Sequence, residues 1–390
     1  MRVPALVPRL RPFTSTIFAE MTALANRTGS VNLGQGFPDT DGPQAMLDAA
    51  KAAIDSGANQ YPPGPGVPAL RQAIAEHRAR YGVRYDPDTE VLVTVGATEA
   101  IAASLLALVE PGDEVLLVEP YYDSYAAAVA MAGATRRAVG LAEEPGTGRL
   151  GLDVAALRAA VTPRTRAVLV NSPHNPTGTV FTRDELAAVA ALCVEHDLVA
   201  ITDEVYEHLV FDGREHLPLA AFPGMAERTV TISSAGKSFN CTGWKIGWAC
   251  APAPLLDAVR AAKQFLTFVG GAPFQPAVAH ALRHELPWVD GLRDSLQDKR
   301  SRLAEGLTDA GFAVRPCEGT YFITADVRPL GFDDGERLCR ELPGRIGVVG
   351  VPVQVFADHP ERWKHLVRFA FCKRDEVLDE AVTRLRKLGG

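Results

Sequence analysis

The sequence predicts a mainly parallel, doubly wound α/β fold followed by a second, smaller α/β unit. Short runs rich in β-branched residues alternate with helical patterns of about 10–15 residues. Strands that alternate with helices in this way form parallel sheets that are covered on both faces. At 390 residues and 41.8 kDa the chain is also too large for one ordinary core. The strand candidates of the larger unit are residues 91–95, 114–118, 167–170, 198–202, 229–233 and 246–250.

The elements fall into three parts along the chain. Residues 1–43 form an N-terminal arm, in which a proline-rich start leads into the loop-like stretch VNLGQGFPDTDGP, and we expect this arm to pack with the smaller domain. Residues 44–286 form the large domain, which includes a helix opened by the capping-box pair Thr182 and Glu185. Residues 287–390 form the small domain. Its elements are a charged helix at about 288–310, strand candidates at 312–314, 320–325 and 366–371, and a final helix at 374–388.

Composition and charge exclude several classes of function. The net charge of −7 and the pI near 5.8 provide no basic face, so we expect neither nucleic acid nor an anionic membrane as a partner. No apolar run reaches the roughly 18 residues of a membrane span. The start, MRVPALVPRLRPF, is broken by three prolines and lacks the apolar core of a signal peptide. The six scattered cysteines form no CxxC pair, so we expect reduced thiols in a cytoplasmic protein.

No metal site is expected. His280 and His284 share a helix face at i, i+4, but the segment HALRH lacks the glutamate of an HExxH metalloprotease. The remaining histidines form no cluster in the sequence.

Polar residues follow three of the apolar strand candidates. The segments are NSPHNPTG (171–178), DEVY (203–206) and SSAGK (233–237). In open parallel sheets, ligands bind outside the carboxyl ends of the strands. These three ends would therefore bring Asn175, Asp203, Tyr206 and Lys237 to one crevice.

This set of residues suits pyridoxal phosphate. Lys237 stands among apolar, hydroxyl-bearing and glycine residues, where desolvation disfavours its ammonium form and makes the amine a usable nucleophile for an aldehyde. Asp203 would keep the ring nitrogen protonated, and Tyr206 with Asn175 would contact the phenolic oxygen.

The phosphate of such a cofactor also needs fixed donors. The helix that follows VLVTVGATEA would offer free backbone N–H groups and a favourable dipole. Ser234 would add a hydroxyl group and Lys245 a positive charge.

Each of these residues also has an ordinary interpretation. Asp203 could cap a helix formed by EVYEHLV, and Asn175 opens a strong turn signal. Tyr206 could be a core aromatic residue, and Lys245 a snorkelling surface lysine. Their joint occurrence at three strand ends favours the functional interpretation.

These segments resemble the signature segments of class I and II pyridoxal-phosphate aminotransferases, which have fold type I. The resemblance covers nearly the whole chain and implies a large domain with a mainly parallel seven-stranded sheet, a smaller α/β C-terminal domain and a homodimer with shared active sites. Within the family, the likeness is strongest to the branch of kynurenine aminotransferases and cysteine-S-conjugate lyases and to N-succinyldiaminopimelate aminotransferases. Further matching segments are NLGQGFPD (32–39), NQYPPGPG (59–66), VGATEA (95–100), EPYYDSY (119–125) and HLVRFAFCK (365–373).

The resemblance implies a role for each matching residue. Lys237 would form the Schiff base with the cofactor and then move a proton, with Asp203 and Tyr206 completing the catalytic set. The implied cofactor-binding residues are Ala97, Thr98, Tyr122, Asn175, Asp203, Tyr206, Ser234, Lys237, Lys245 and Tyr61 of the partner subunit. The implied substrate-binding residues are Arg368, Gly36, Asn175, Phe18 and Phe268.

Arg368 would clamp the substrate α-carboxylate bidentately, a task suited to the guanidinium fork. On its own, an arginine that alternates with apolar residues in a strand would instead be a solvent-facing rim residue. The segment 264–278 has no arginine for a second carboxylate, which argues against strict aspartate specificity and suits a longer or aromatic side chain, with Phe268 as a wall.

The resemblance leaves three functional hypotheses. The first is transfer of an amino group from glutamate to a 2-oxo acid or aldehyde, as in the N-succinyldiaminopimelate aminotransferase of lysine biosynthesis. The second is a kynurenine-, glutamine- or methionine-type aminotransferase with cysteine-S-conjugate β-lyase activity. The third, an aminotransferase-like effector domain of a transcription regulator, needs a DNA-binding module, for which the arm before residue 31 has no room.

Overall fold

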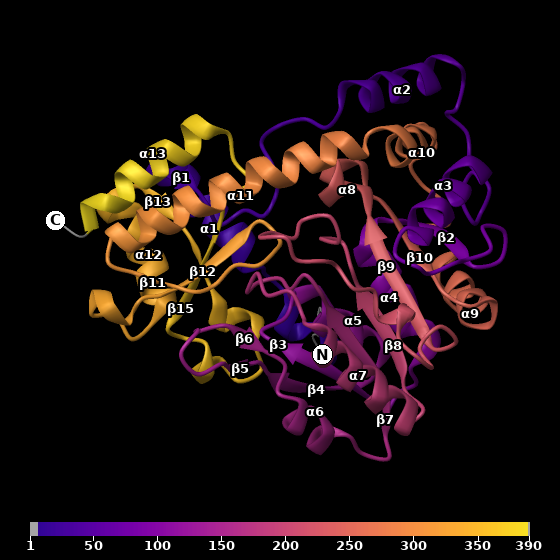
Figure 1. Cartoon of the computed structure of the whole chain (residues 1–390), viewed down its shortest axis with the longest axis horizontal. Coiled ribbons are helices and arrows are strands. Elements are labelled where there is room, and N and C mark those ends of the chain that lie inside the picture. Colours follow the sequence, from indigo (N-terminus) through magenta and orange to yellow (C-terminus); the bar gives the residue numbers. More distant parts are fainter. Residues whose placement is uncertain (1–6, 389–390) are drawn as a thin grey trace, which may run out of the picture.

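A seven-stranded, mainly parallel sheet forms the centre of the larger part of the protein, which confirms the predicted fold class (Figure 1). The computed structural model describes residues 7–388. Strand β10 runs antiparallel to β2 and β9, and the other neighbouring strands are parallel. In spatial order the strands are β2 (Val91–Val95), β10 (Ile246–Cys250), β9 (Thr229–Ser234), β8 (Val199–Asp203), β7 (Thr165–Asn171), β3 (Glu114–Glu119) and β4 (Thr135–Gly140).

Six of these strands coincide with the predicted apolar runs, and β4 is the strand that the sequence pattern did not indicate. Its sequence, TRRAVG, places two arginines next to each other. Because β4 lies at the edge of the sheet, its first four residues are partly or fully exposed, and an apolar run is not required there.

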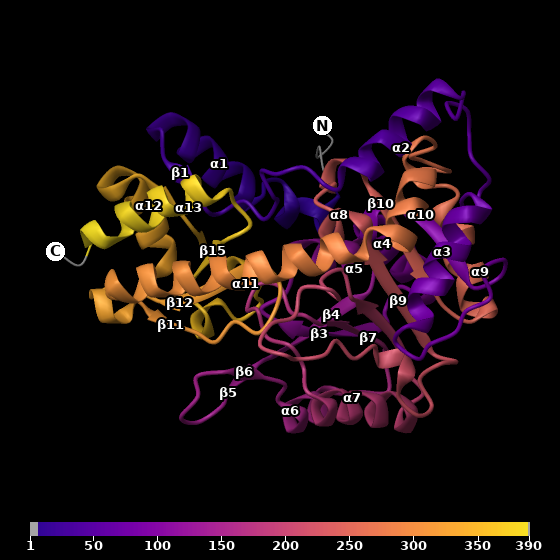
Figure 2. The ribbon, with the colours of Figure 1, turned by 45° about the horizontal axis from the view of Figure 1, so that its top comes forward.

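Helices cover both faces of this sheet (Figure 2). Alternate residues of β3 point to opposite sides: Val115 and Leu117 pack in one apolar cluster, and Leu116 and Val118 in another. The first cluster includes α4 (Gly96–Leu108), α5 (Asp123–Ala132) and α9 (Ala253–Lys263), and the second includes α6 (Val154–Ala160) and α7 (Arg183–Glu195). A third cluster joins β2 and β10 to α2 (Gln44–Asp55), α3 (Pro68–Ala79) and α10 (Phe274–His284). Helix α7 opens with the predicted capping box of Thr182 and Glu185.

A four-stranded sheet lies in the C-terminal part of the chain, which the long helix α11 (Leu286–Asp309) joins to the larger part (Figure 1). Its strands, in spatial order, are β11 (Ala313–Val314), β12 (Phe322–Asp326), β15 (Leu366–Ala370) and β14 (Val351–Pro352), with neighbouring helices α12 (Gly335–Ile346) and α13 (Asp375–Leu385). A two-stranded sheet of β5 (Ala142–Glu143) and β6 (Leu150–Gly151) stands apart from both.

Residues 17–32 of the N-terminal segment pack against this C-terminal part, whereas η1 (Pro8–Phe13) lies against α5 of the larger part (Figure 2). Strand β1 (Val31–Asn32) pairs in parallel with β13 (Val348–Val349), and α1 (Ile17–Thr28) lies against α12. The domain boundaries 1–43, 44–286 and 287–390 stay a prediction.

Within residues 7–388, no helix is both long enough and apolar enough to cross a bilayer. All six cysteines are free and buried.

Candidate active site

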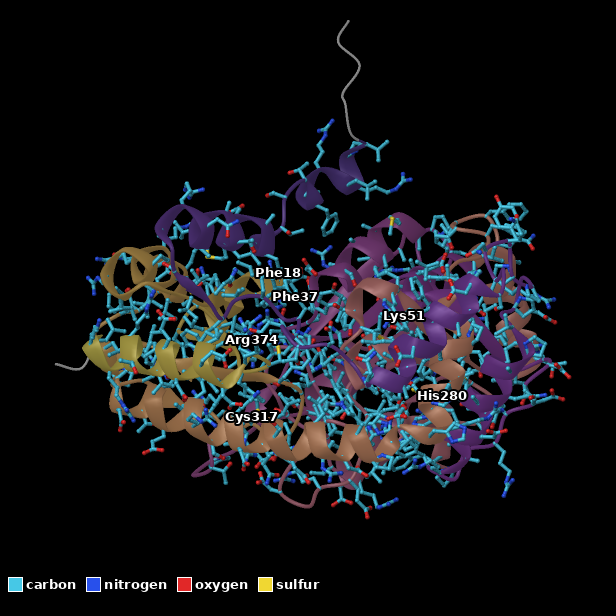
Figure 3. The ribbon with its side chains drawn as sticks, turned by 90° about the horizontal axis from the view of Figure 1, so that it is seen from above. Phe18, Phe37, Lys51, His280, Cys317 and Arg374 are labelled. Carbon is cyan, nitrogen blue, oxygen red and sulfur yellow. The ribbon has the colours of Figure 1, made fainter. Side chains whose placement is uncertain are left out.

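One cavity of about 240 Å³ gathers most of the residues singled out from the sequence. It lies where β7, β8 and β9 end, and Phe18 and Phe37 reach it from the N-terminal segment between the two parts of the molecule (Figure 3). The predicted site residues that line it are Phe18, Gly36, Ala97, Thr98, Tyr122, Asn175, Asp203, Tyr206, Ser234, Lys237, Lys245 and Arg368.

Lys237 lies in the short helix α8 (Ala235–Ser238), directly after β9. Its Nζ donates a hydrogen bond of 2.8 Å to the hydroxyl group of Tyr321. Burial lowers the pKa of Lys237 to about 8, and the nearby Cys372 and Asp203 make this decrease smaller. Most of the amine is still protonated at neutral pH, but the unprotonated, nucleophilic fraction is far larger than that of an ordinary lysine.

Asp203 is the last residue of β8 and is buried. Its Oδ2 accepts a hydrogen bond of 2.7 Å from the Tyr125 hydroxyl, and its Oδ1 accepts one of 3.3 Å from the backbone N–H of Val205. Burial raises the pKa of Asp203, while both hydrogen bonds oppose that rise. Residues 205–208 form turns, so Asp203 does not cap a helix over EVYEHLV.

Arg368 and Asn175 meet although 193 residues separate them. The Nη1 of Arg368 donates to Asn175 Oδ1 at 2.9 Å, and Nη2 donates to the carbonyl of Gly34 at 3.1 Å. Only 1% of Arg368 is exposed, so the alternative of a solvent-facing rim residue is wrong. Burial lowers the pKa of Arg368 to about 10, which leaves the group charged at neutral pH.

Among residues 7–388, no carboxylate forms an ion pair with the Arg368 guanidinium. Its central carbon lies 3.9 Å from the centroid of the Phe322 ring, and its Nε has no hydrogen-bond partner within residues 7–388. A buried cation with a free donor that lines a cavity is suited to an anionic ligand.

The start of α4 provides a cradle for a second anion. Gly96 has φ +74°, and a Cβ added there would lie 2.9 Å from Lys245 Nζ. A Cβ on Gly247 would lie 2.5 Å from the carbonyl carbon of Gly96. Gly247 thus lets β10 approach the start of α4, and Gly96 leaves room for Lys245. The helix N-terminus, Lys245 and Ser234 line one part of the cavity, and a phosphate group fits their donors.

Aromatic side chains complete the walls. Tyr122 stands at the N-terminus of α5, and burial raises the pKa of its hydroxyl to about 12. Tyr206 packs in the apolar core, as its ordinary interpretation requires, and it also lines the cavity, where its contact with a cofactor stays a prediction. An amine, a buried carboxylate, an aromatic wall and a phosphate cradle together fit the four chemical features of pyridoxal phosphate.

Tyr61 and Phe268 do not line the cavity of their own chain. Their rings touch edge to face at 5.4 Å, and the two residues are 81% and 50% exposed. Phe265, at 84% exposure, and Leu266 extend this apolar surface. The role of Tyr61 and Phe268 across a subunit interface stays a prediction.

Sequence reasoning missed two tyrosines next to the site. Tyr125 follows Tyr122 by three residues on a helix, a spacing that places both on one face and could have indicated it. Tyr321 carried no local signal, because it precedes an apolar strand and reaches Lys237 only through the packing of the two parts of the chain.

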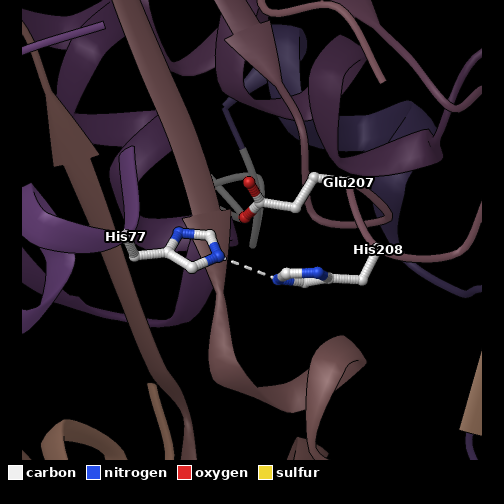
Figure 4. Close-up of side chains that lie close together, drawn as sticks. All are labelled: His77, Glu207 and His208. Carbon is white, nitrogen blue, oxygen red and sulfur yellow. Dashed lines mark hydrogen bonds between the residues drawn. The ribbon is translucent and has the colours of Figure 1, made fainter. Parts of the chain in front are cut away.

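His77, Glu207 and His208 form a separate cluster outside the cavity (Figure 4). The two Nε2 atoms are 2.9 Å apart and hydrogen-bonded to each other. Both carboxylate oxygens of Glu207 are also engaged, by Arg78 at 2.7 Å and by Ser233 at 2.6 Å. Burial lowers the pKa of His77 to about 3, so its ring is neutral. Both Nε2 atoms and both Glu207 oxygens already have hydrogen-bond partners, so the cluster is part of a buried hydrogen-bond network, in which His77 Nδ1 has no partner among residues 7–388.

Comparisons with known proteins agree with this geometry. The family described as aminotransferase class I and II matches residues 28–385. The probable N-succinyldiaminopimelate aminotransferase DapC of Mycobacterium tuberculosis (strain ATCC 25618 / H37Rv) is 63% identical over 391 residues, which cover 98% of each chain. The methionine aminotransferase of Escherichia coli (strain K12) is 40% identical over 98% of this chain and 99% of its own.

The solved structures give the same result. The structure of N-succinyldiaminopimelate aminotransferase from Mycobacterium tuberculosis superposes with a TM-score of 0.96 at 64% identity, over 98% of this chain and 100% of the other. Because the family match extends along almost the entire sequence and both parts of the fold, this protein belongs to the class I and II aminotransferases.

Proposed function

We propose that this aminotransferase uses pyridoxal 5'-phosphate to move the amino group of glutamate to N-succinyl-2-amino-6-oxopimelate, the reaction of an N-succinyldiaminopimelate aminotransferase in lysine biosynthesis. The observation that carries the proposal is one cavity in which the Lys237 amine, the Asp203 carboxylate and the Arg368 guanidinium face the same space. The identity of 63% to the Mycobacterium tuberculosis relative supports the choice of substrate.

Pyridoxal phosphate, when bound, supplies an aldehyde for the amino group and a ring that withdraws electrons from the substrate Cα. In our proposal, Lys237 holds the aldehyde and the Asp203 carboxylate holds the proton on the ring nitrogen. Asn175 and Tyr206 face the ring oxygen, and Tyr122 packs on the ring. The phosphate is held by Ala97, Thr98, Ser234 and Lys245, together with Tyr61 of the partner subunit.

Arg368 binds and orients the substrate. Its guanidinium binds the α-carboxylate, and this ion pair gives the buried cation a counter-charge. Asn175, already hydrogen-bonded to Nη1, keeps the guanidinium plane fixed. Phe18 and Phe322, whose rings lie 5.2 and 3.9 Å from the guanidinium carbon, exclude water from the ion pair.

Lys237 moves the proton. Its Nζ, with a pKa of about 8, accepts the proton of the substrate Cα as a general base and returns it as a general acid. A pKa close to the working pH favours both directions of transfer. Because one Arg368 serves the carboxylate of either substrate, the two substrates use the cavity in turn and the kinetics are ping-pong.

The proposal includes a homodimer in the cytoplasm. Tyr61, Phe265, Leu266 and Phe268 are large apolar residues on the surface, and their exposure in a single chain suits burial against a second copy. Phe268 also has φ +63°, an unusual conformation for a bulky residue that fits a position with a specific task.

Half-reactions of the holoenzyme test this proposal. The cofactor absorbance is followed after mixing with glutamate, N-succinyldiaminopimelate, kynurenine, glutamine or methionine, each without an oxo acid. We expect glutamate and N-succinyldiaminopimelate to convert the cofactor, and Lys237→Arg protein to show no borohydride-trapped adduct. Conversion by kynurenine together with failure of N-succinyldiaminopimelate would refute the proposed substrate.

A second candidate function is a kynurenine-, glutamine- or methionine-type aminotransferase with cysteine-S-conjugate β-lyase activity. The identity of 40% to a methionine aminotransferase and the lack of arginine at residues 264–278 support it. Release of pyruvate from a cysteine conjugate in the absence of an oxo acid distinguishes this activity from transamination.

A further inference from the structure

We propose that Tyr321 is a positioning residue whose hydroxyl group holds the free Lys237 amine in place and ties it to the backbone of Gly36. The Tyr321 oxygen lies 2.8 Å from Lys237 Nζ and 2.6 Å from the carbonyl oxygen of Gly36. Lys237 and Gly36 stand 84 and 285 residues from Tyr321 in the sequence. The inference rests on the proposed function, in which Lys237 moves a proton.

The direction of both hydrogen bonds follows from the chemistry of the groups. The Gly36 carbonyl can only accept, so the single proton of the Tyr321 hydroxyl points to Gly36. The Tyr321 oxygen is then left as an acceptor for an N–H of Lys237. One N–H of the Lys237 amine is thus fixed toward Tyr321. The other substituents and the lone pair of the tetrahedral Nζ can then point in only a limited range of directions. The hydroxyl holds Nζ in this orientation whenever the amine is not covalently engaged.

The surroundings of Tyr321 fix its own position. The ring is buried and packs edge to face against Tyr206 at 5.2 Å and Phe322 at 4.8 Å. Thr320, the preceding residue, has φ +69°, which is strained for a β-branched residue. Its N–H donates to the carbonyl of Leu209 at 2.8 Å, and its hydroxyl accepts from Phe322 N–H at 3.1 Å. These bonds hold the strained turn that presents Tyr321 to Lys237.

Gly36 permits the second contact. A Cβ added at Gly36 would lie 2.5 Å from the Phe322 ring, so a larger residue would push the backbone away from Tyr321. The glycine therefore serves the close approach of its carbonyl to the hydroxyl. Gly36 also lines the cavity, so the Tyr321 hydroxyl joins the backbone of the cavity wall to the Lys237 amine.

A purely structural role for the hydroxyl predicts a different result from a positioning role. An oxygen that accepts from Lys237 favours the ammonium form, so its loss must change the titration of the amine. A hydroxyl that only satisfies the buried Gly36 carbonyl would affect stability alone. The other ionisable groups around the amine are Cys372, Asp203, Lys245, Arg368 and Tyr206.

The test measures how fast trinitrobenzenesulfonate modifies Lys237 in the cofactor-free protein as a function of pH, with the modified peptide quantified by mass spectrometry. In Tyr321→Phe, which keeps the ring, we expect the profile to shift to lower pH by on the order of one unit, the size expected for one lost charge-assisted hydrogen bond. Tyr85→Phe is the matched control, because the Tyr85 hydroxyl bonds Thr231 at 3.2 Å and does not line the cavity. Its profile should match that of the unaltered protein.

A Lys237 profile that is unchanged in Tyr321→Phe would overturn the proposal, including the case in which only the melting temperature falls. Thermal unfolding and circular dichroism establish that the variant is folded before its profile is compared.

In the holoenzyme of Tyr321→Phe, we expect the rate of the glutamate half-reaction to fall while the glutamate concentration for half-maximal rate stays the same. Borohydride trapping on unaltered protein tests the proposed function separately: a shifted profile without a trapped adduct would refute that function and leave the contact of Tyr321 with Lys237 in place.

Discussion

The hydroxyl group of Tyr125 donates a hydrogen bond of 2.7 Å to Oδ2 of Asp203, deep in the cavity. Tyr125 comes from α5 and Asp203 from the end of β8, and both residues are buried. The bond lowers the pKa of a carboxyl group that burial raises. In the proposed function, Tyr125 therefore helps to keep Asp203 ionised for a cationic ring.

Tyr125→Phe should lower kcat/KM by about 10-fold to 100-fold, the effect of one hydrogen bond to a charged group. The hydrogen bond from Tyr125 lowers the pKa of Asp203, so loss of this bond raises that pKa. The acid limb of the kcat/KM profile should therefore move to higher pH. Tyr121→Phe is the control, since its hydroxyl bonds Asp358 at 2.8 Å and does not line the cavity. An unshifted acid limb in Tyr125→Phe would contradict this role.

Arg368→Lys should reduce kcat/KM by roughly 100-fold to 1000-fold for every amino acid substrate, because an ammonium cannot reproduce two parallel hydrogen bonds to a carboxylate. The bonds of Arg368 to Asn175 and Gly34 would also be disturbed. Steady-state kinetics with glutamate measure the effect. Arg337→Lys, on the exposed face of α12, should keep full activity. Equal kcat/KM for both variants would rule out the carboxylate role of Arg368.

Lys237→Met should stabilise the cofactor-free protein at pH 7, by up to about 3 kcal/mol, because a buried lysine with a lowered pKa opposes folding when it is protonated. This unfavourable contribution of Lys237 to the free energy of folding is fully present below a pH of about 8. Between about 8 and 10.5 the unfolded chain binds the proton and the folded protein does not, so the penalty disappears as the pH rises. Thermal unfolding of both proteins from pH 7 to 10.5 measures the difference.

The matched control for this prediction is Lys51→Met, which alters an exposed lysine. It should show no pH-dependent gain in melting temperature. A constant difference between Lys237→Met and the unaltered protein across the pH range would mean that the Lys237 amine is not shifted.

Phe268→Asp should weaken the proposed homodimer and lower activity together, because it places a charge in the apolar surface formed with Tyr61, Phe265 and Leu266. Light scattering and activity are measured over a dilution series. Met131→Asp, which alters an apolar residue of similar exposure (41%) on α5, should leave both unchanged. A fully active monomer of Phe268→Asp would show that the surface does not serve the site.

Local sequence patterns were sufficient for most of the fold. Six strands were predictable because strands buried on both faces have continuous apolar runs, and the edge strand β4 was not, because its arginines are tolerated in water. The same logic located much of the site. Asn175, Asp203 and Lys237 lie at or just after the ends of three neighbouring parallel strands, so their proximity is a consequence of strand direction.

The sequence by itself determined the candidate residues for the chemistry: an amine, a carboxylate and hydroxyl groups at strand ends, with a glycine at the start of a helix. Only the tertiary structure decided how these groups are held. The contacts of Lys237 with Tyr321, of Asp203 with Tyr125 and of Arg368 with Asn175 join segments 84, 78 and 193 residues apart. Periodicity encodes which face of a strand or helix is buried, but the direction of a buried hydrogen bond depends on how separate elements pack. That packing is a property of the whole chain.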